Sequence, residues 1–243
     1  MNLNQMLEIL YEDAGLIAIN KPAGLLVHRT RIAAEEQHEF AIQMLRDQIG
    51  VHVHPVHRLD RATSGVLLFT KNRELIPLIE KEFAERRVKK TYLALVRGVP
   101  REAVGTFDRP LESERSKRLQ EAITRFKFLS SAEIPFDTTG RYPSSRYALL
   151  ELSPETGRTH QIRRHLAQAR HYIIGDKKHG DNKQNKFFES QFKLQKMLLH
   201  AHTLEFTHPI ENEVIRIKAE LPVHFRAILM DLGIKEEEVS NMS

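Results

Sequence analysis

HRLDRATSGVLLFT, residues 57–70, begins as a charged loop and ends in an apolar run that predicts a buried strand. The loop part, 57–65, holds a single acidic residue, Asp60, among basic neighbours. Charged groups beside a buried strand cost free energy unless they are paired or hydrogen-bonded. One interpretation is a solvated loop whose arginines form weak surface ion pairs. The other is a functional loop, and the rest of the chain favours it.

The segments around this loop predict an α+β fold, a mixed and mostly antiparallel sheet with covering helices and loops. Apolar runs and β-favouring residues predict strands at 7–11, 16–20, 66–70, 91–96, 146–152, 197–206 and 213–219. Helical spacing of apolar residues predicts helices at 38–49, 74–87, 159–169 and 222–232. The glycine- and aspartate-rich segment 171–182 is expected to be a loop.

Residues 101–145 differ from the rest because they are polar and include Pro110, Pro135, Gly140 and Pro143. We interpret them as an insertion built on one added hairpin, since only 122–129 alternates like a strand. The expected organisation is a single catalytic domain over 1–233, followed by an acidic C-terminal tail at 234–243.

The composition excludes several classes of protein. The 243 residues include no cysteine, so a disulfide framework and a thiolate metal site are both excluded. We see no signal peptide and no apolar run long enough to span a bilayer, so cytoplasm is the expected location. A net charge of +5, with basic clusters at 86–90 and 158–164, favours a polyanionic partner such as a nucleic acid.

Closely spaced histidines at 52, 54 and 57 raise the alternative of a metal-dependent phosphoesterase. The metallohydrolase pattern His-x-His-x-Asp-His is close in form, but Val56 occupies its acidic position. Single histidines more often pack or form hydrogen bonds, so we expect no metal.

Four stretches together, 20–28, 57–65, 90–92 and 156–163, resemble the RluA family of pseudouridine synthases in order and spacing. HRLDRATSG is similar to the catalytic loop of that family, and TGRTHQIR is similar to its later basic motif. LLHA at 198–201 resembles a further motif near the C-terminus. The resemblance covers about residues 7 to 222, and it implies the pseudouridine synthase fold, an isomerase activity and no cofactor.

The resemblance also implies the catalytic residues. Conversion of uridine to pseudouridine breaks the bond from ribose C1′ to N1 and forms one from C1′ to C5, without oxidation. This chemistry needs an anion or nucleophile beside C1′, and Asp60 is the one acid in the loop. Arg163 is the expected partner of Asp60 by motif position. The resemblance implies that Tyr92 is the residue whose ring stacks on the flipped uracil, and it is a candidate acceptor for the C5 proton.

Four further residues are expected to bind the substrate. Arg58 resembles the family arginine that fills the gap left by an extruded nucleotide. Arg158 and His160 are candidates for contacts with phosphate or for positioning a loop, with structural roles as the alternative. Leu199, in the LLHA motif, completes the expected substrate-binding set.

The family resemblance also bears on the RNA substrate. Many members carry an N-terminal RNA-binding domain of the S4 type, and here the catalytic motifs begin almost at once. RNA binding is therefore expected from the catalytic domain and the segment 101–145. Segments 140–143 and 175–181 most resemble family members that modify uridine 65 of tRNA. We expect a monomer that acts on tRNA. Ribosomal RNA is the alternative substrate, and a non-catalytic RNA-binding protein is the alternative class.

Overall fold

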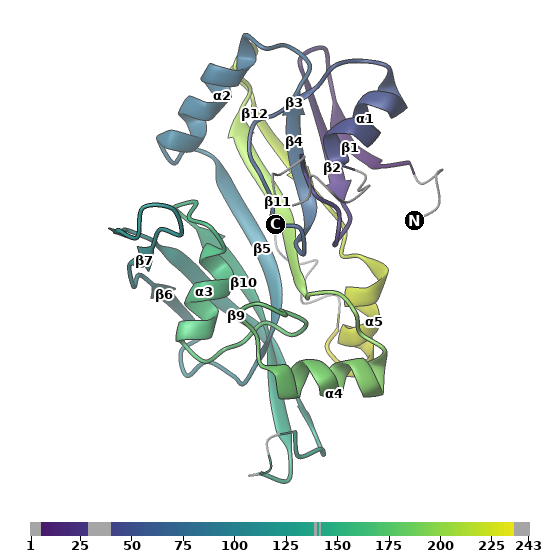
Figure 1. The fold of residues 1–243 in the computed structure, drawn as a ribbon, viewed down its shortest axis with the longest axis vertical. Coiled ribbons are helices and arrows are strands. Elements are labelled where there is room, and N and C mark those ends of the chain that lie inside the picture. Colours follow the sequence, from purple (N-terminus) through teal and green to yellow (C-terminus); the bar gives the residue numbers. More distant parts are fainter. Residues whose placement is uncertain (1–5, 29–39, 139, 141, 236–243) are drawn as a thin grey trace. The chain divides into compact units, whose positions relative to one another are not determined.

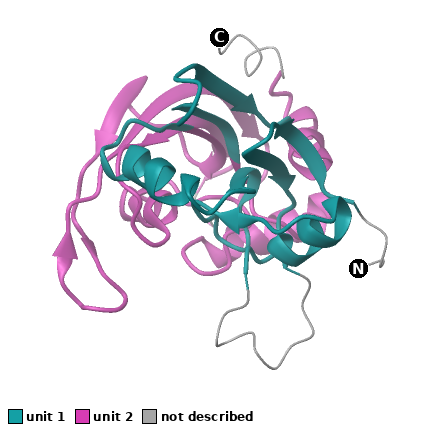
Figure 2. Cartoon of the chain, turned by 90° about the horizontal axis from the view of Figure 1, so that it is seen from above, with its two compact units in different colours: residues 1–90, 201–220 teal, residues 91–200, 221–243 magenta. Residues whose placement is uncertain are grey.

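The computed structural model describes residues 6–28, 40–138, 140 and 142–235 (Figure 1). The chain forms two compact units (Figure 2). Unit 1 comprises residues 1–90 and 201–220, and unit 2 comprises residues 91–200 and 221–243. The chain thus leaves unit 1 once and returns to it for a single segment before it ends in unit 2. In the described part of the chain, no helix is long and apolar enough to cross a membrane.

Unit 1 is built on strands that lie side by side in the order β1 (Glu8–Glu12), β2 (Leu16–Lys21), β4 (Ser64–Thr70) and β11 (Leu199–Thr207). β12 (Val214–Lys218) also pairs with β11, and the short β3 (His54–Pro55) pairs with β4. The pairs β1–β2, β2–β4, β3–β4 and β11–β12 are antiparallel. All seven residues of β4 are buried, as the apolar run predicts.

Two helices belong to unit 1, α1 (Ala41–Ile49) and α2 (Leu75–Ala84). α1 ends at Gly50, whose φ of 68° lies in the left-handed region that glycine adopts readily. α2 carries Pro77 in its first turn, where the missing N–H costs nothing. Leu75 and Ile79 of α2 pack with apolar residues of β2 and β4 in one core cluster.

Unit 2 contains an antiparallel run of strands, β5 (Lys89–Arg97), β10 (Ser145–Pro154), β9 (Thr124–Ile134) and β6 (Val104–Phe107). β7 (Leu111–Glu112) and β8 (Leu119–Gln120) form a separate hairpin. The helices are α3 (Gln161–Gln168), α4 (Asn182–Phe192) and α5 (Val223–Asp231). Side chains of β5, β10, α4 and α5 share one core cluster.

The structure confirms the α+β class and the strands and helices expected at the sites named above. Of the helix expected at 38–49, residues 38 and 39 lie outside the described residues. One expectation is wrong and one helix was not predicted. The segment 101–145 contains β6, the β7–β8 hairpin and the eleven-residue β9, so it is richer in strands than one added hairpin. The chain after 181 forms the helix α4, which the sequence reasoning missed.

Candidate active site

The seven predicted site residues are divided between the two units. Asp60 and Arg58 belong to unit 1. Tyr92, Arg163, Arg158 and His160 belong to unit 2, and so does Leu199, because the division between the units falls within β11, after residue 200.

In unit 1, the charged loop follows β3 and leads into β4. Arg58 is exposed, Leu59 is buried and Asp60 is half-buried, so the loop turns its apolar residue inward and keeps the arginine at the surface. The Asp60 carbonyl accepts a hydrogen bond from the Thr63 N–H at 3.1 Å, which closes a turn directly after the carboxylate.

The loop ends at Gly65, where the backbone lies very close to β11. Gly65 has a φ of 110°, and a Cβ atom built on it would lie 2.1 Å from the Ala201 carbonyl oxygen. Glycine is therefore required here for both conformation and space. The close approach fixes where the loop joins the core of unit 1.

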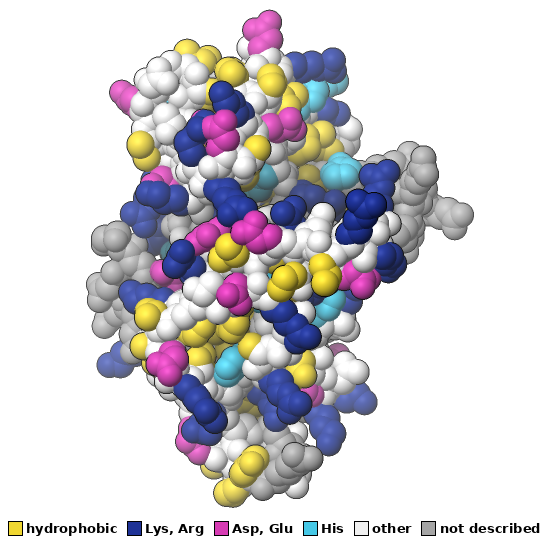
Figure 3. Space-filling view, turned by 90° about the vertical axis from the view of Figure 1, so that its left-hand side faces the viewer, with side chains coloured by type: hydrophobic (Ala, Val, Ile, Leu, Met, Phe, Trp, Pro, Cys, Tyr) yellow, Lys and Arg dark blue, Asp and Glu magenta, His cyan; other side chains and the backbone are white. Residues whose placement is uncertain are grey.

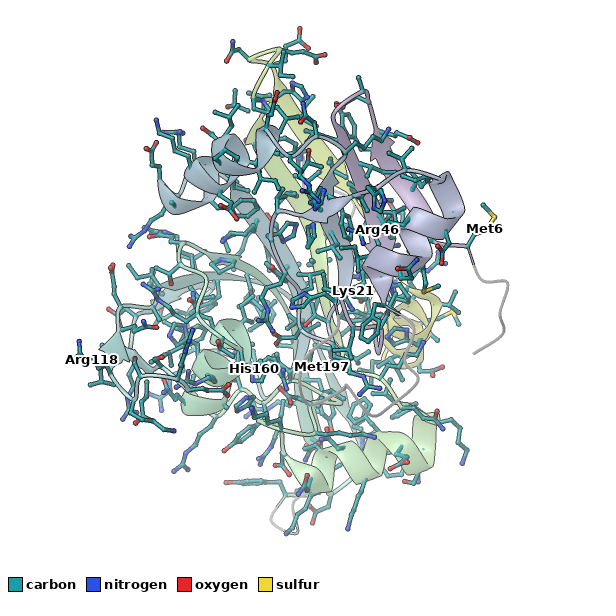
Figure 4. The ribbon with its side chains drawn as sticks, turned by 45° about the horizontal axis from the view of Figure 1, so that its top comes forward. Met6, Lys21, Arg46, Arg118, His160 and Met197 are labelled. Carbon is teal, nitrogen blue, oxygen red and sulfur yellow. The ribbon has the colours of Figure 1, made fainter. Side chains whose placement is uncertain are left out.

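Lys21, at the end of β2, is labelled in Figure 4 and forms a hydrogen bond with the charged loop at Arg61. Its side chain is fully buried, and its Nζ donates to the carbonyl oxygens of Pro22 at 2.9 Å, Leu25 at 2.9 Å and Arg61 at 3.3 Å. The Gly24 N–H also donates to the Arg61 carbonyl at 2.7 Å. The turn after β2 and the loop after Asp60 are thus held together.

Burial lowers the pKa of Lys21 to about 7, and the negative charge of Asp60 opposes that shift. The lysine therefore lies within the electrostatic reach of the carboxylate.

In unit 2, Arg163 lies on α3 and is buried, with Asp176 as a bidentate partner. Arg163 Nε donates to Asp176 Oδ2 and Nη2 donates to Oδ1, both at 2.8 Å. Asp176 also accepts the backbone N–H groups of Lys178 and His179. Burial alone would raise the pKa of Asp176, but these hydrogen bonds and the guanidinium charge outweigh it and lower the pKa.

Arg158 and His160 lie just before the start of α3, and each contacts a different partner. Arg158 Nε donates to the Glu121 carbonyl oxygen at 2.9 Å. His160 adopts the left-handed conformation with φ of 53°, and its Nδ1 lies 2.9 Å from His179 Nε2. In this pair one ring donates and the other accepts. Both residues thus make contacts within unit 2, and these contacts fit the structural roles that were the alternative to substrate binding.

Tyr92 and Leu199 lie on strands. Tyr92, on β5, is half-buried and pairs in register with Leu152 of β10. Leu199 begins β11 and is buried.

Two of the three histidines considered for a metal, His54 and His57, form hydrogen bonds within the protein. His54 Nε2 accepts a hydrogen bond from Arg73 Nε at 3.2 Å, and His57 Nε2 accepts one from the Leu68 N–H at 3.0 Å. Among the residues that the structure describes, no group of three or more histidine, aspartate or glutamate side chains is placed to hold a metal ion.

Sequence reasoning missed the roles of Lys21 and Asp176. Lys21 lies in the motif stretch 20–28, beside Pro22. That motif could have marked Lys21 as a site residue, but it does not predict the three carbonyl oxygens that the side chain binds. Asp176 follows Gly175 in a segment singled out for its resemblance to tRNA enzymes, but nothing in the sequence pairs it with Arg163.

The profile of the RNA pseudouridylate synthase family matches residues 15–168, a segment that includes the charged loop, Tyr92 and Arg163. This chain belongs to that family. The enzyme is therefore an isomerase that converts uridine to pseudouridine in RNA. The match begins just before β2 and ends with α3, so it includes both Lys21 and the helix that carries Arg163.

Relatives of this synthase support the assignment over nearly the whole chain. It is 47% identical over 225 residues to tRNA pseudouridine synthase C of Vibrio parahaemolyticus, which covers 88% of this chain and 90% of the relative. It is 43% identical to tRNA pseudouridine synthase C of Vibrio cholerae, with coverage of 97% and 100%. Among solved structures, human RNA pseudouridylate synthase domain containing 4 is similar, with a TM-score of 0.71, 26% identity and 93% coverage of each chain.

Proposed function

We propose that this synthase modifies tRNA, at uridine 65 in the T stem. The observation that carries the substrate class is the set of relatives at 43–47% identity, aligned over at least 90% of their own length, that are named tRNA pseudouridine synthase C. The position within tRNA rests on the resemblance of segments 140–143 and 175–181 to members that modify uridine 65. Such an enzyme would work in the cytoplasm, and we expect it to act as a monomer.

In this proposal Asp60 acts at ribose C1′. The carboxylate attacks C1′ or stabilises its developing positive charge while the C1′–N1 bond breaks. The detached uracil turns and C5 forms a bond with C1′, which displaces the carboxylate if it had bonded to C1′; the C5 proton then leaves and N1 gains a proton. Atoms therefore balance without any oxidant or second substrate. Lys21 and the turn at Thr63 support this role, because they hold the backbone on the C-terminal side of the carboxylate.

Arg58 is proposed to occupy the space that the flipped nucleotide leaves. Arg58 is exposed and Asp60, two residues later, is half-buried, which suits an arginine that enters RNA while the carboxylate stays within the enzyme. Extrusion of a base costs a few kcal/mol, and a paired base in a stem adds the loss of its pair. Tyr92 is proposed to stack on the extruded uracil, and acceptance of the C5 proton is its second candidate role.

Arg163 is proposed to partner Asp60, as its motif position implies. The bidentate bond with Asp176 supports this role, because it holds the guanidinium plane in one orientation. Arg158, His160 and Leu199 remain proposed contacts of the substrate. The bond of Arg158 to the Glu121 carbonyl supports a role in which it positions the start of α3.

RNA binding outside the catalytic loop is proposed to involve the β7–β8 hairpin in segment 101–145. Arg115, Lys117 and Arg118 are exposed at its tip, and Arg118 projects at the outer edge of unit 2 (Figure 4). Lys178 joins the hairpin to the loop of Asp176 through an ion pair with Glu114 at 2.9 Å. Lysine and arginine side chains are also spread over the face of the molecule seen in Figure 3. Such groups suit the phosphates of a folded RNA.

The test uses unmodified transcripts. The enzyme is incubated with tRNA that carries uridine 65, with the same tRNA carrying cytidine at that position, and with ribosomal RNA fragments. Pseudouridine is then mapped by position. Conversion of uridine 65 alone supports the proposal. Efficient conversion of ribosomal RNA with no change in tRNA would overturn the substrate while leaving the enzyme class intact.

A further inference from the structure

The ring of His57, the first residue of the charged loop, forms a hydrogen bond with the backbone of the buried strand β4. Its Nε2 accepts a hydrogen bond from the Leu68 N–H at 3.0 Å. On the same residue of β4, the Leu68 carbonyl oxygen accepts the Val56 N–H at 3.4 Å. Leu68 is fully buried. Without the ring, its N–H would lose the partner that the structure gives it in the core.

A second contact fixes the plane of the ring. His57 stacks on Phe83 of α2, with ring centroids 5.2 Å apart and an angle of 28° between the planes. The ring is therefore held by β4 through its edge and by α2 through its face. Accepting through Nε2 requires the neutral ring with the proton on Nδ1. Burial lowers the pKa of His57 to about 3, with a smaller contribution from the charge of Lys90, so the ring is neutral at physiological pH.

The position of His57 in the loop gives this bond a consequence for the reaction. Arg58 follows directly, and Asp60 is three residues away. On the other side of Asp60, Arg61 is held by Lys21 and by Gly24. The two residues proposed to act on the nucleotide thus lie on a short segment with one anchor at each end.

We propose that His57 is a positioning residue, which fixes the start of the loop that carries Arg58 and Asp60 through its hydrogen bond with the Leu68 N–H. This inference rests on the proposed role of Asp60. Loss of the bond would let the loop shift while leaving the RNA-binding surfaces in place. A misplacement of about 1 Å at a reacting group is enough to lower a rate by about 100-fold. The effect is therefore expected on turnover and not on affinity.

The experiment compares two substitutions of His57 on the full chain. His57→Phe keeps a ring to stack on Phe83 and removes the acceptor. His57→Gln loses the ring but places an amide oxygen at the same number of bonds from Cβ as Nε2. Single-turnover rates and Kd are measured with the tRNA transcript, and thermal unfolding reports folding. His52→Phe, at an exposed histidine nearby in the sequence, is the matched control.

We expect His57→Phe to lower the single-turnover rate by about 100-fold with Kd unchanged, His57→Gln to restore most of the rate, and His52→Phe to behave as the wild type. A wild-type rate for His57→Phe would overturn the inference. So would a Gln variant as slow as Phe, or a loss of affinity equal to the loss of rate. A wild type that forms no pseudouridine would instead overturn the proposed function.

A measurement on the unmutated protein keeps the inference testable if His57→Phe does not fold. In protein labelled with ¹⁵N at histidine, the Nε2 of His57 should remain unprotonated at pH 5 and show coupling to the Leu68 N–H. A protonated Nε2 at that pH, or coupling to no backbone amide, would contradict the proposed bond directly.

Discussion

Arg163 and Asp176 form a buried ion pair with two parallel hydrogen bonds of 2.8 Å in unit 2. The side chain of Arg163 is 7% exposed and that of Asp176 is 1% exposed, so solvent screens the pair very little. Two bonds from one guanidinium to one carboxylate fix the plane of both groups. The orientation of Arg163 therefore depends on a residue thirteen positions later in the chain.

Asp176→Asn is expected to destabilise the fold and to slow catalysis. The substitution removes the negative charge that holds the buried Arg163 guanidinium through two hydrogen bonds, and breaking such a pair costs about 3–5 kcal/mol. The free energy of unfolding is measured by urea denaturation, with single-turnover rates taken under folding conditions. Glu114→Gln is the control, because the pair of Glu114 with Lys178 is half exposed and should contribute less than about 1 kcal/mol. Equal effects of the two substitutions would contradict this account.

Asp60→Asn is expected to abolish turnover while folding and RNA binding remain close to those of the wild type. Asparagine keeps the shape of the side chain and removes the charge that the reaction at C1′ requires. Pseudouridine formation is followed in single-turnover reactions, with Kd measured in parallel. Asp47→Asn, at an exposed position of α1 in the same unit, should have no effect. A rate for Asp60→Asn within tenfold of the wild type would refute the assignment.

Arg58→Ala is expected to reduce the rate much more than the affinity. The side chain is proposed to act on the flipped nucleotide, so its loss leaves ground-state binding to phosphates nearly unchanged. Rates and Kd are measured on the same transcript, and the substrate is then changed to one with a mismatch at position 65. A mismatch lowers the cost of base extrusion and should partly restore the rate. Equal losses in rate and affinity would instead identify Arg58 as a phosphate contact.

The sequence predicts the parts of this fold that depend on local pattern. Residues 66–69 of β4 are an uninterrupted apolar run, and all seven residues of the strand are buried. α4 was missed because its sequence, NKQNKFFESQF, is mostly polar and has its two buried residues at only one helical spacing. Its start depends on Asp181, whose side chain caps the Lys183 and Gln184 N–H groups.

The candidate site shows the same division between local pattern and long-range contact. The motifs predict Asp60, Tyr92 and Arg163 by their position in the chain, and all three lie in the segment that the family profile matches. The contact of Lys21 with the Arg61 carbonyl joins residues forty positions apart. No periodicity or composition encodes such a contact, because it exists only once β2 and the charged loop have folded against each other.

Lys21 is expected to make stability depend on pH above neutrality. Its pKa falls from 10.5 to about 7 on folding, so between these values the unfolded chain binds one more proton than the folded chain. The free energy of unfolding must then rise with pH across this window. The gain from pH 7 to pH 9 is about 2 kcal/mol. Urea denaturation at several pH values measures it. Lys21→Met should lose this gain and Lys117→Met should retain it. The same pH dependence in the Lys21 variant would refute the assignment.

The β7–β8 hairpin is expected to contribute to RNA affinity through counterion release. Arg115, Lys117 and Arg118 are exposed at its tip, and each phosphate contact contributes about 0.7–0.9 to the slope of log K against log salt concentration. Replacing all three by glutamine should therefore weaken tRNA binding at low salt and reduce that slope by about 2. The single-turnover rate at saturating RNA should remain close to that of the wild type, because the hairpin carries none of the proposed catalytic residues.

The matched control for the hairpin is a triple glutamine variant at Lys183, Lys186 and Lys196, three exposed lysines in or after α4. It removes the same formal charge from another part of unit 2. If binding depends only on net charge, the two triple variants will lose equal affinity and equal slope. If the hairpin contacts phosphates, the slope will fall only in the hairpin variant, because distant charges release no counterions from the bound RNA. An unchanged slope in the hairpin variant would remove segment 101–145 from the RNA-binding surface.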